Sequence, residues 1–106
     1  MTLQPDLYDV VTRGRMLLAA GDPTTAAGML THAATLAPTD RAVHTDLARA
    51  CFDSAQLHRA EAAFRTLVDL DPTDVWARRG LARTMRRLSR RDEAAAQDRI
   101  ADALDA

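Results

Sequence analysis

Three arginines recur at one interval along the 106-residue chain. Arg15, Arg49 and Arg83 are separated from one another by 34 residues. A guanidinium group presents a planar fork of donors that binds a carboxylate through two hydrogen bonds at once. If the elements that carry these residues repeat at the same interval, the three side chains form a row. Such a row would suit an acidic or extended peptide.

Residue types that support catalysis or metal binding form no recognisable pattern. His32, His44 and His58 are not spaced as ligands on one helix face, and nucleophile elbows and phosphate-binding loops are absent. Cys51 is the only cysteine, which excludes an intrachain disulfide and a cysteine-based metal site. The sequence therefore predicts no enzyme, no cofactor and no metal.

The composition favours closely packed helices. Hydrophobic residues make up 47% of the chain but aromatic residues only 4%, and no lysine is present. The net charge of −1 predicts no general attraction to anions.

The start of the chain lacks the pattern of a secretion signal, and no apolar stretch approaches the roughly 20 residues that span a bilayer. We therefore expect a cytoplasmic protein that does not enter a membrane.

Glycine and proline divide the chain into six predicted helices. Gly21 is a helix stop, and Pro38 and Pro72 cannot continue a helix. Asp22 is predicted to cap the second helix, and Thr39 or Asp40 the third. The first helix starts near Pro5 or Leu7. The predicted helices cover approximately residues 7–20, 23–37, 41–54, 57–70, 75–88 and 90–104.

The same residue types return every 34 residues. Leu-x-Pro-Thr-Asp occurs at 36–40 and again at 70–74. Small residues coincide on the first and on the second helix of each pair, where they would let helix axes approach closely. A period of this length indicates stacked helix pairs rather than one closed core. The coincident small residues are Gly14, Ala48 and Ala82, and then Ala26, Ala60 and Ala94.

This pattern resembles the tetratricopeptide repeat family. The resemblance implies an all-α, right-handed α-solenoid of three helix-turn-helix repeats in one domain, residues 1–106. The repeats cover about 7–40, 41–74 and 75–106. The chain departs from the family pattern at several positions. Val10, His44 and Arg78 stand where the family favours tryptophan, Arg13 replaces a leucine, and Asp98 replaces a large apolar residue.

The resemblance also implies a binding surface and a function. In this family the first helix of each repeat lines a concave groove that holds peptides. The predicted function is non-catalytic protein–protein interaction, as an adaptor, assembly factor or small chaperone, with an acidic partner as one candidate. Alternatively, Asp46 and Asp53 neutralise the arginines. The predicted partner-binding residues are Tyr8, Arg15, Arg49, Phe52, Trp76, Arg79, Arg83 and Arg86.

Two other functions remain open from the sequence. The run Arg78–Arg91 contains seven arginines and no acid, which is a possible nucleic-acid stripe. Acids of the following helix, such as Asp98 and Asp102, are expected to lie alongside it and oppose that function. The last helix is poorly apolar, so it is either a solvent-facing cap or an interface. In the second case another copy would cover Ile100 and Leu104.

Overall fold

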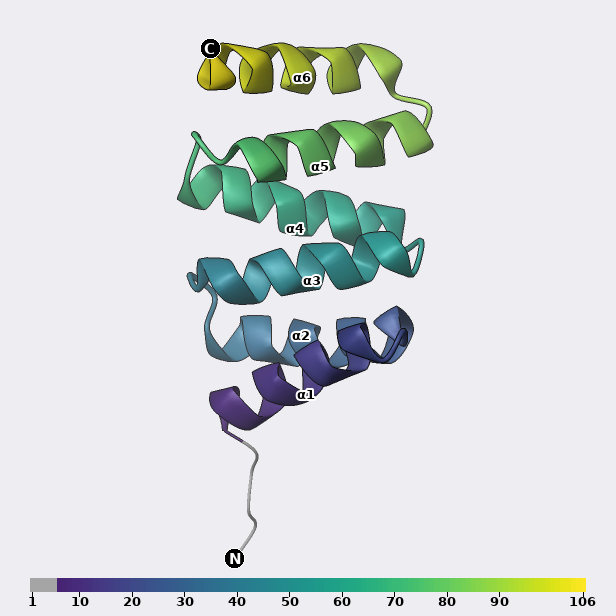
Figure 1. The fold of residues 1–106 in the computed structure, drawn as a ribbon, viewed down its shortest axis with the longest axis vertical. Coiled ribbons are helices and arrows are strands. Elements are labelled where there is room, and N and C mark those ends of the chain that lie inside the picture. Colours follow the sequence, from purple (N-terminus) through teal and green to yellow (C-terminus); the bar gives the residue numbers. More distant parts are fainter. Residues whose placement is uncertain (1–5) are drawn as a thin grey trace, which may run out of the picture.

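The computed structural model describes residues 6–106, and these residues form six helices stacked in the order of the sequence (Figure 1). The part of the chain described contains no strand, so the prediction of an all-α fold is confirmed. Residues 1–5, including Pro5, lie outside the described residues. The helices are α1 (Leu7–Ala19), α2 (Pro23–Leu36), α3 (Arg41–Asp53), α4 (Leu57–Leu70), α5 (Val75–Arg87) and α6 (Arg91–Asp105).

Aspartates cap four of the helices. Asp22 caps α2, as predicted, and its carboxylate accepts a hydrogen bond from the backbone N–H of Thr25 at 3.2 Å. Asp6, Asp40 and Asp74 do the same at the starts of α1, α3 and α5. These three aspartates are one period apart, so each repeat begins with the same cap. Each cap satisfies a backbone donor that has no partner within its helix.

A left-handed residue links the two helices of each repeat. Gly21, Ala55 and Ser89 have φ angles of 80°, 58° and 62°. They are 34 residues apart and lie between α1 and α2, α3 and α4, and α5 and α6. Only glycine adopts this region without a steric cost. The turns at Ala55 and Ser89 therefore have the same left-handed backbone conformation as the turn at Gly21, but they are locally strained.

Small residues bring the helices together as predicted. Ala26, Ala48, Ala60 and Ala82 are fully buried. At Gly14 the approach is closer still, because an added Cβ would lie 2.8 Å from the Leu30 side chain. Leu30 is itself fully buried. The packing of large side chains onto small ones in successive repeats explains why the 34-residue period sets the spacing of the stack.

The array is elongated, with principal extents of 52 × 24 × 19 Å. Each helix packs mainly on its neighbours in the sequence (Figure 1). Repeat boundaries are fastened by side chains at the family's tryptophan position: His44 Nε2 lies 2.8 Å from the Pro38 carbonyl oxygen, and Arg78 donates to the Pro72 carbonyl oxygen. Across residues 6–106, each helix is too short or too polar to cross a lipid bilayer.

Candidate partner-binding site

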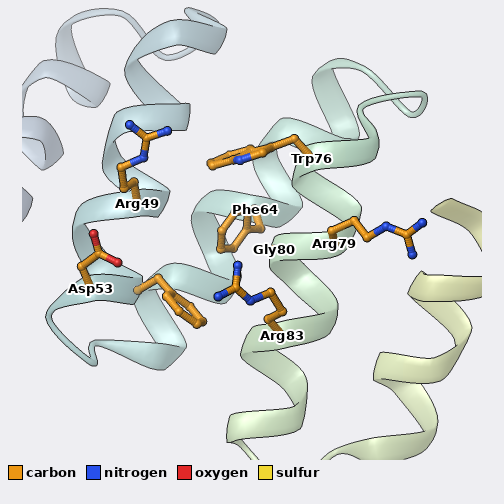
Figure 2. A pocket seen from close by; sticks show the side chains of 8 residues that line it. Arg49, Asp53, Phe64, Trp76, Arg79, Gly80 and Arg83 are labelled. Atoms are coloured by element: carbon orange, nitrogen blue, oxygen red, sulfur yellow. The ribbon is translucent and has the colours of Figure 1, made fainter. Parts of the chain in front are cut away.

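A pocket of about 240 Å³ opens between α3, α4 and α5. We call it the α3–α5 pocket. Figure 2 shows Arg49 and Asp53 on one side and Trp76 and Arg83 on the other, with Phe64 between them. The lining residues are Arg49, Phe52, Asp53, Phe64, Trp76, Arg79, Gly80 and Arg83. Five of the eight predicted binding residues, Arg49, Phe52, Trp76, Arg79 and Arg83, therefore meet in one place.

The floor of the pocket depends on an aromatic pair and a glycine. The Phe64 and Trp76 rings have centroids 5.4 Å apart and are tilted by 53°. A Cβ at position 80 would lie 2.2 Å from Phe64 Cε1, so the ring requires the bare backbone of Gly80. Phe64 is buried, whereas Trp76 is 42% exposed. The pair thus supports an indole ring that remains partly exposed.

Two arginines of the pocket rest on aromatic rings. The Arg49 guanidinium carbon lies 5.9 Å from the centroid of a Trp76 ring, and that of Arg83 lies 5.2 Å from the Phe52 centroid. Arg87 approaches Phe52 from the same helix as Arg83, at 5.4 Å. Among residues 6–106, neither Arg49 nor Arg83 has a carboxylate within ion-pair distance, although Asp53 also lines the pocket. Cation–π contact orients these guanidinium groups without neutralising them.

Arg15, the remaining arginine of the row, has a different environment. Arg15 Nε donates to Asp46 Oδ2 at 2.7 Å, which joins α1 to α3. Arg15 does not line the pocket. Tyr8 is 76% exposed on α1 and is also outside it. The structure thus brings Arg49 and Arg83 together with aromatic side chains, while Arg15 follows the alternative in which Asp46 neutralises it.

Arg79 and Arg86 are engaged by α6. Arg79 contacts Asp98, Asp102 and Asp105, and Arg86 donates to Asp98 at 2.6 Å. In Figure 2 the Arg79 guanidinium points away from the pocket, so only the lower part of its side chain contributes to the lining. Burial raises the pKa of Asp98, but the hydrogen bonds and positive charges of Arg86 and Arg79 outweigh burial and hold this pKa below its usual value.

Two further arginines of the basic run also have polar partners. Arg78 bonds to the Pro72 carbonyl and to Gln97, and Arg90 pairs with Glu61 and Glu93. The Arg90 hydrogen bond is the main influence that lowers the pKa of Glu61, with Arg65 adding to it. The expectation that acids of the last helix lie beside the arginines is therefore correct. Arg83, Arg87 and Arg91 form no ion pair among residues 6–106, so the acids neutralise only part of the run.

The end of the array exposes two large apolar side chains of α6, Ile100 and Leu104. Leu104 is 39% exposed, but its equivalents Leu70 and Leu36, one and two periods earlier, are 36% and 49% exposed. The exposure of Leu104 thus belongs to every repeat. Ile100 is 40% exposed, whereas the positions one and two periods earlier hold the polar residues Thr66 and His32. The described residues also contain no group of His, Cys, Asp and Glu side chains that could hold a metal ion.

Sequence reasoning missed the part that Phe64 and Gly80 play in this site. Phe64 matched the family's apolar filler position, and nothing in the pattern showed that its ring also supports Trp76. One signal was available for Gly80. The positions one and two periods earlier hold Asp46 and Thr12, so a glycine there marks a close approach peculiar to the third repeat.

A family model identifies the repeats. The model described as Tetratricopeptide repeat matches residues 17–68, which include α2, α3 and most of α4. The chain is a tetratricopeptide repeat protein. Membership of this family supports a role for the chain as a protein–protein interaction module. None of the curated proteins compared with this sequence shows a significant match.

Solved structures agree on the fold. The chain is similar to MamA AMB-1, with 20% identity and a TM-score of 0.89 over 94% of this chain and 59% of that one. MamA MSR-1 gives 19% identity and 0.88 over 94% and 57%. MamA from Desulfovibrio magneticus RS-1 gives 23% and 0.86 over 93% and 56%. This tetratricopeptide repeat protein therefore spans less than three fifths of each of these chains and shares their helical solenoid fold.

Proposed function

We propose that this protein binds an acidic segment of a partner protein in the α3–α5 pocket. Arg49 and Arg83 receive carboxylates of the segment, and Trp76 and Phe52 contact its apolar side chains. A module of this kind serves as an adaptor, an assembly factor or a small chaperone. The observation that supports the proposal most directly is that neither arginine has an acidic partner among residues 6–106.

The energetic argument rests on what a ligand must displace. A carboxylate that binds Arg15, Arg79 or Arg86 has to break an existing ion pair, which offsets much of the gain. At Arg49 and Arg83 it breaks none. Hydrogen bonds to charged groups contribute about 1.5–3 kcal/mol each. A ligand carboxylate therefore gains more at the pocket than at the other arginines of the predicted site.

The aromatic residues supply the second half of the recognition. Trp76 is partly exposed and is held in place by Phe64 and Arg49. Tryptophan and arginine are the residue types that contribute most to binding when they lie at the centre of an interface. An orientation fixed before binding reduces the entropy lost when a ligand arrives. The proposed ligand thus combines acidic residues with a large apolar side chain.

The experiment selects ligands before it measures them. A displayed library of random 12-residue peptides is panned on the wild-type protein, and enriched peptides are measured by fluorescence anisotropy. We expect enrichment of Asp or Glu beside Leu, Phe or Trp. The double variant Arg49→Glu/Arg83→Glu should weaken binding of these peptides by tenfold or more, on the order of 1.4 kcal/mol or above.

A matched variant controls for net charge. Arg91→Glu reverses an arginine at the start of α6 that is exposed and does not line the pocket. It should leave peptide affinity within about twofold, and circular dichroism should show that all variants remain helical. If the selected peptides carry no acidic residues, or bind the double variant as well as the wild type, the pocket is not the binding site.

A further inference from the structure

A second cavity lies at the opposite end of the array from α6. Its volume is about 420 Å³, and its lining comes from the end of α1 and from α2. We call this surface the N-terminal end face. It shares no residue with the α3–α5 pocket. The lining residues are Arg13, Met16, Leu17, Ala20 and Met29.

The repeat register shows what covers the same surface elsewhere in the molecule. Arg13, Leu17 and Met29 are one period before Leu47, Cys51 and Ala63, which line a cavity beside α3. There, Thr31 of the preceding helix α2 forms an additional wall. The first repeat has no preceding helix in the described residues. The N-terminal end face is therefore the surface that corresponds to the part of α3 that α2 covers.

Burial confirms this comparison. Met16 is 65% exposed, whereas Ala50, its equivalent in the second repeat, is fully buried. Thr84, the equivalent in the third repeat, is also fully buried. A large apolar side chain is thus exposed at a position that is covered in both later repeats. Covering such a side chain typically stabilises a complex by burial of apolar area.

Arg13 sets the charge that a covering helix needs. Its equivalents, Leu47 and Leu81, are apolar, and Leu81 is almost fully buried. Arg13 is exposed and forms no ion pair among residues 6–106, although Asp9 lies one turn away on α1. A helix that packs here as α2 packs on α3 would place its residue at the level of Thr31 near this guanidinium group.

From these observations we propose that the N-terminal end face binds an amphipathic helix of a partner protein. The helix presents small side chains toward Met16 and Leu17 and a carboxylate toward Arg13. It lies along α1 as α2 lies along α3, where Ala33 packs with Val43. This site is independent of the α3–α5 pocket and extends the stack at its other end.

The charge at the end face argues against a second copy of this chain as the occupant. In a head-to-tail stack of two copies, α6 is the helix of residues 6–106 that would pack against α1 of the next copy. Its residue at the level of Thr31, two periods later, is Arg99. Head-to-tail stacking would bring Arg99 toward Arg13 of the next copy. Two guanidinium groups that lie side by side repel each other, because both carry positive charge.

A peptide copied from α2 tests the proposal. The probe is residues 23–36 with Thr31→Glu, held helical by a lactam bridge because isolated helices of this length are marginal in water. A second peptide carries Thr31→Arg. We expect the glutamate peptide to bind the wild-type protein about fivefold more tightly than the arginine peptide, since exposed ion pairs contribute up to about 1 kcal/mol.

Charge reversal on the protein completes the cycle. Arg13→Glu should invert the preference between the two peptides, whereas Arg91→Glu should leave it unchanged. Nuclear magnetic resonance should place the perturbed amides in α1 and the start of α2. The proposal is overturned if the glutamate peptide does not bind at millimolar concentration, if Arg13→Glu leaves the preference unchanged, or if the perturbed amides surround Trp76.

Self-association is tested separately by light scattering over a dilution series. A monomer at every concentration agrees with a heterologous partner. A dimer or larger assembly that Met16→Asp dissociates would show that a second copy occupies the end face, and would overturn the proposal. Binding of the two α2-derived peptides to the Arg49→Glu/Arg83→Glu variant should be unaffected, which separates this inference from the proposed function of the pocket.

Discussion

At the scale of single residues, Gly80 has the largest influence on the candidate site. The Phe64 ring lies against its backbone so closely that an added Cβ would be 2.2 Å from Cε1. The same ring supports Trp76, and Trp76 in turn orients Arg49. One missing side chain on α5 therefore positions an aromatic ring of α4 and a cation of α3.

Replacing this glycine gives a direct test. Gly80→Ala should destabilise the protein by about 1–3 kcal/mol, because the new methyl group forces Phe64 to move. Gly28→Ala is the control: an added Cβ at this position in α2 meets open space. It should stabilise by about 0.5–1 kcal/mol, since alanine is the better helix former. Urea unfolding measures both, and equal effects would contradict the proposed contact.

At the scale of elements, the turn between the two helices of a repeat is the least favourable local structure. Ala55 and Ser89 have positive φ, which Gly21 adopts in the first repeat without cost. Ala55→Gly should therefore stabilise the protein by about 1 kcal/mol. Ala62→Gly is the matched control at an exposed position inside α4. There, the same change should destabilise by about 1 kcal/mol. Thermal or urea unfolding would reveal the opposite signs.

The contacts of Glu61 make stability depend on pH. Hydrogen bonds from Arg90 and Arg65 lower its pKa from the ordinary value of 4.5. The folded chain therefore binds fewer protons than the unfolded chain in mildly acidic solution. This contribution is complete above about pH 5 and is lost as the pH falls through the lowered value. Asp98, whose pKa is also lowered, acts in the same direction.

The corresponding measurement is urea unfolding from pH 7 to pH 3. The wild-type protein should lose stability over this range, and Glu61→Gln should be less stable at pH 7 with a shallower dependence on pH. Asp69→Asn, at an exposed aspartate of α4 with no ion pair among the described residues, serves as a control and should leave the slope unchanged. A slope that Glu61→Gln does not alter would show that its ion pairs do not contribute.

Much of this element-level structure follows from the sequence. Prolines, glycines and aspartate caps are local signals, and the helix bounds lie within about two residues of those predicted. The stacking followed from the period. Contacts such as Arg49 with Trp76 could not be predicted, because they depend on side-chain rotamers and on the space at Gly80. The left-handed turn at Ala55 was missed although Gly21 stands one period before it.

At the scale of the whole molecule, stability should decrease from the centre of the stack toward its ends. Helix α3 has five buried residues and α4 has four, whereas α1 and α6 have two each. In a stack whose repeats contact only neighbours, terminal helices lose fewer contacts on opening. The charged side chains of Asp98 and Asp102 provide α6 with ion pairs in place of an apolar face.

Hydrogen exchange should display this gradient. Amides of α1 and α6 should exchange at least tenfold faster than those of α3 and α4, a difference of about 1.4 kcal/mol in opening free energy. Lowering the pH below 4 should reduce the opening free energy of α6 further, as Asp98 becomes protonated. Uniform protection across all six helices would instead indicate a single cooperative unit.

The nearest-neighbour packing of the helices makes the length of this molecule adjustable. Duplicating residues 41–74 in tandem, with Asp46→Gly in the second copy, would insert one more hairpin, because the substitution gives the new junction the bare backbone that Phe64 finds at Gly80. The duplicate would carry a second Arg49 and Phe52, but only the copy next to Trp76 would meet an indole. A lengthened rod would therefore still hold one complete ligand pocket, moved farther from the first helix.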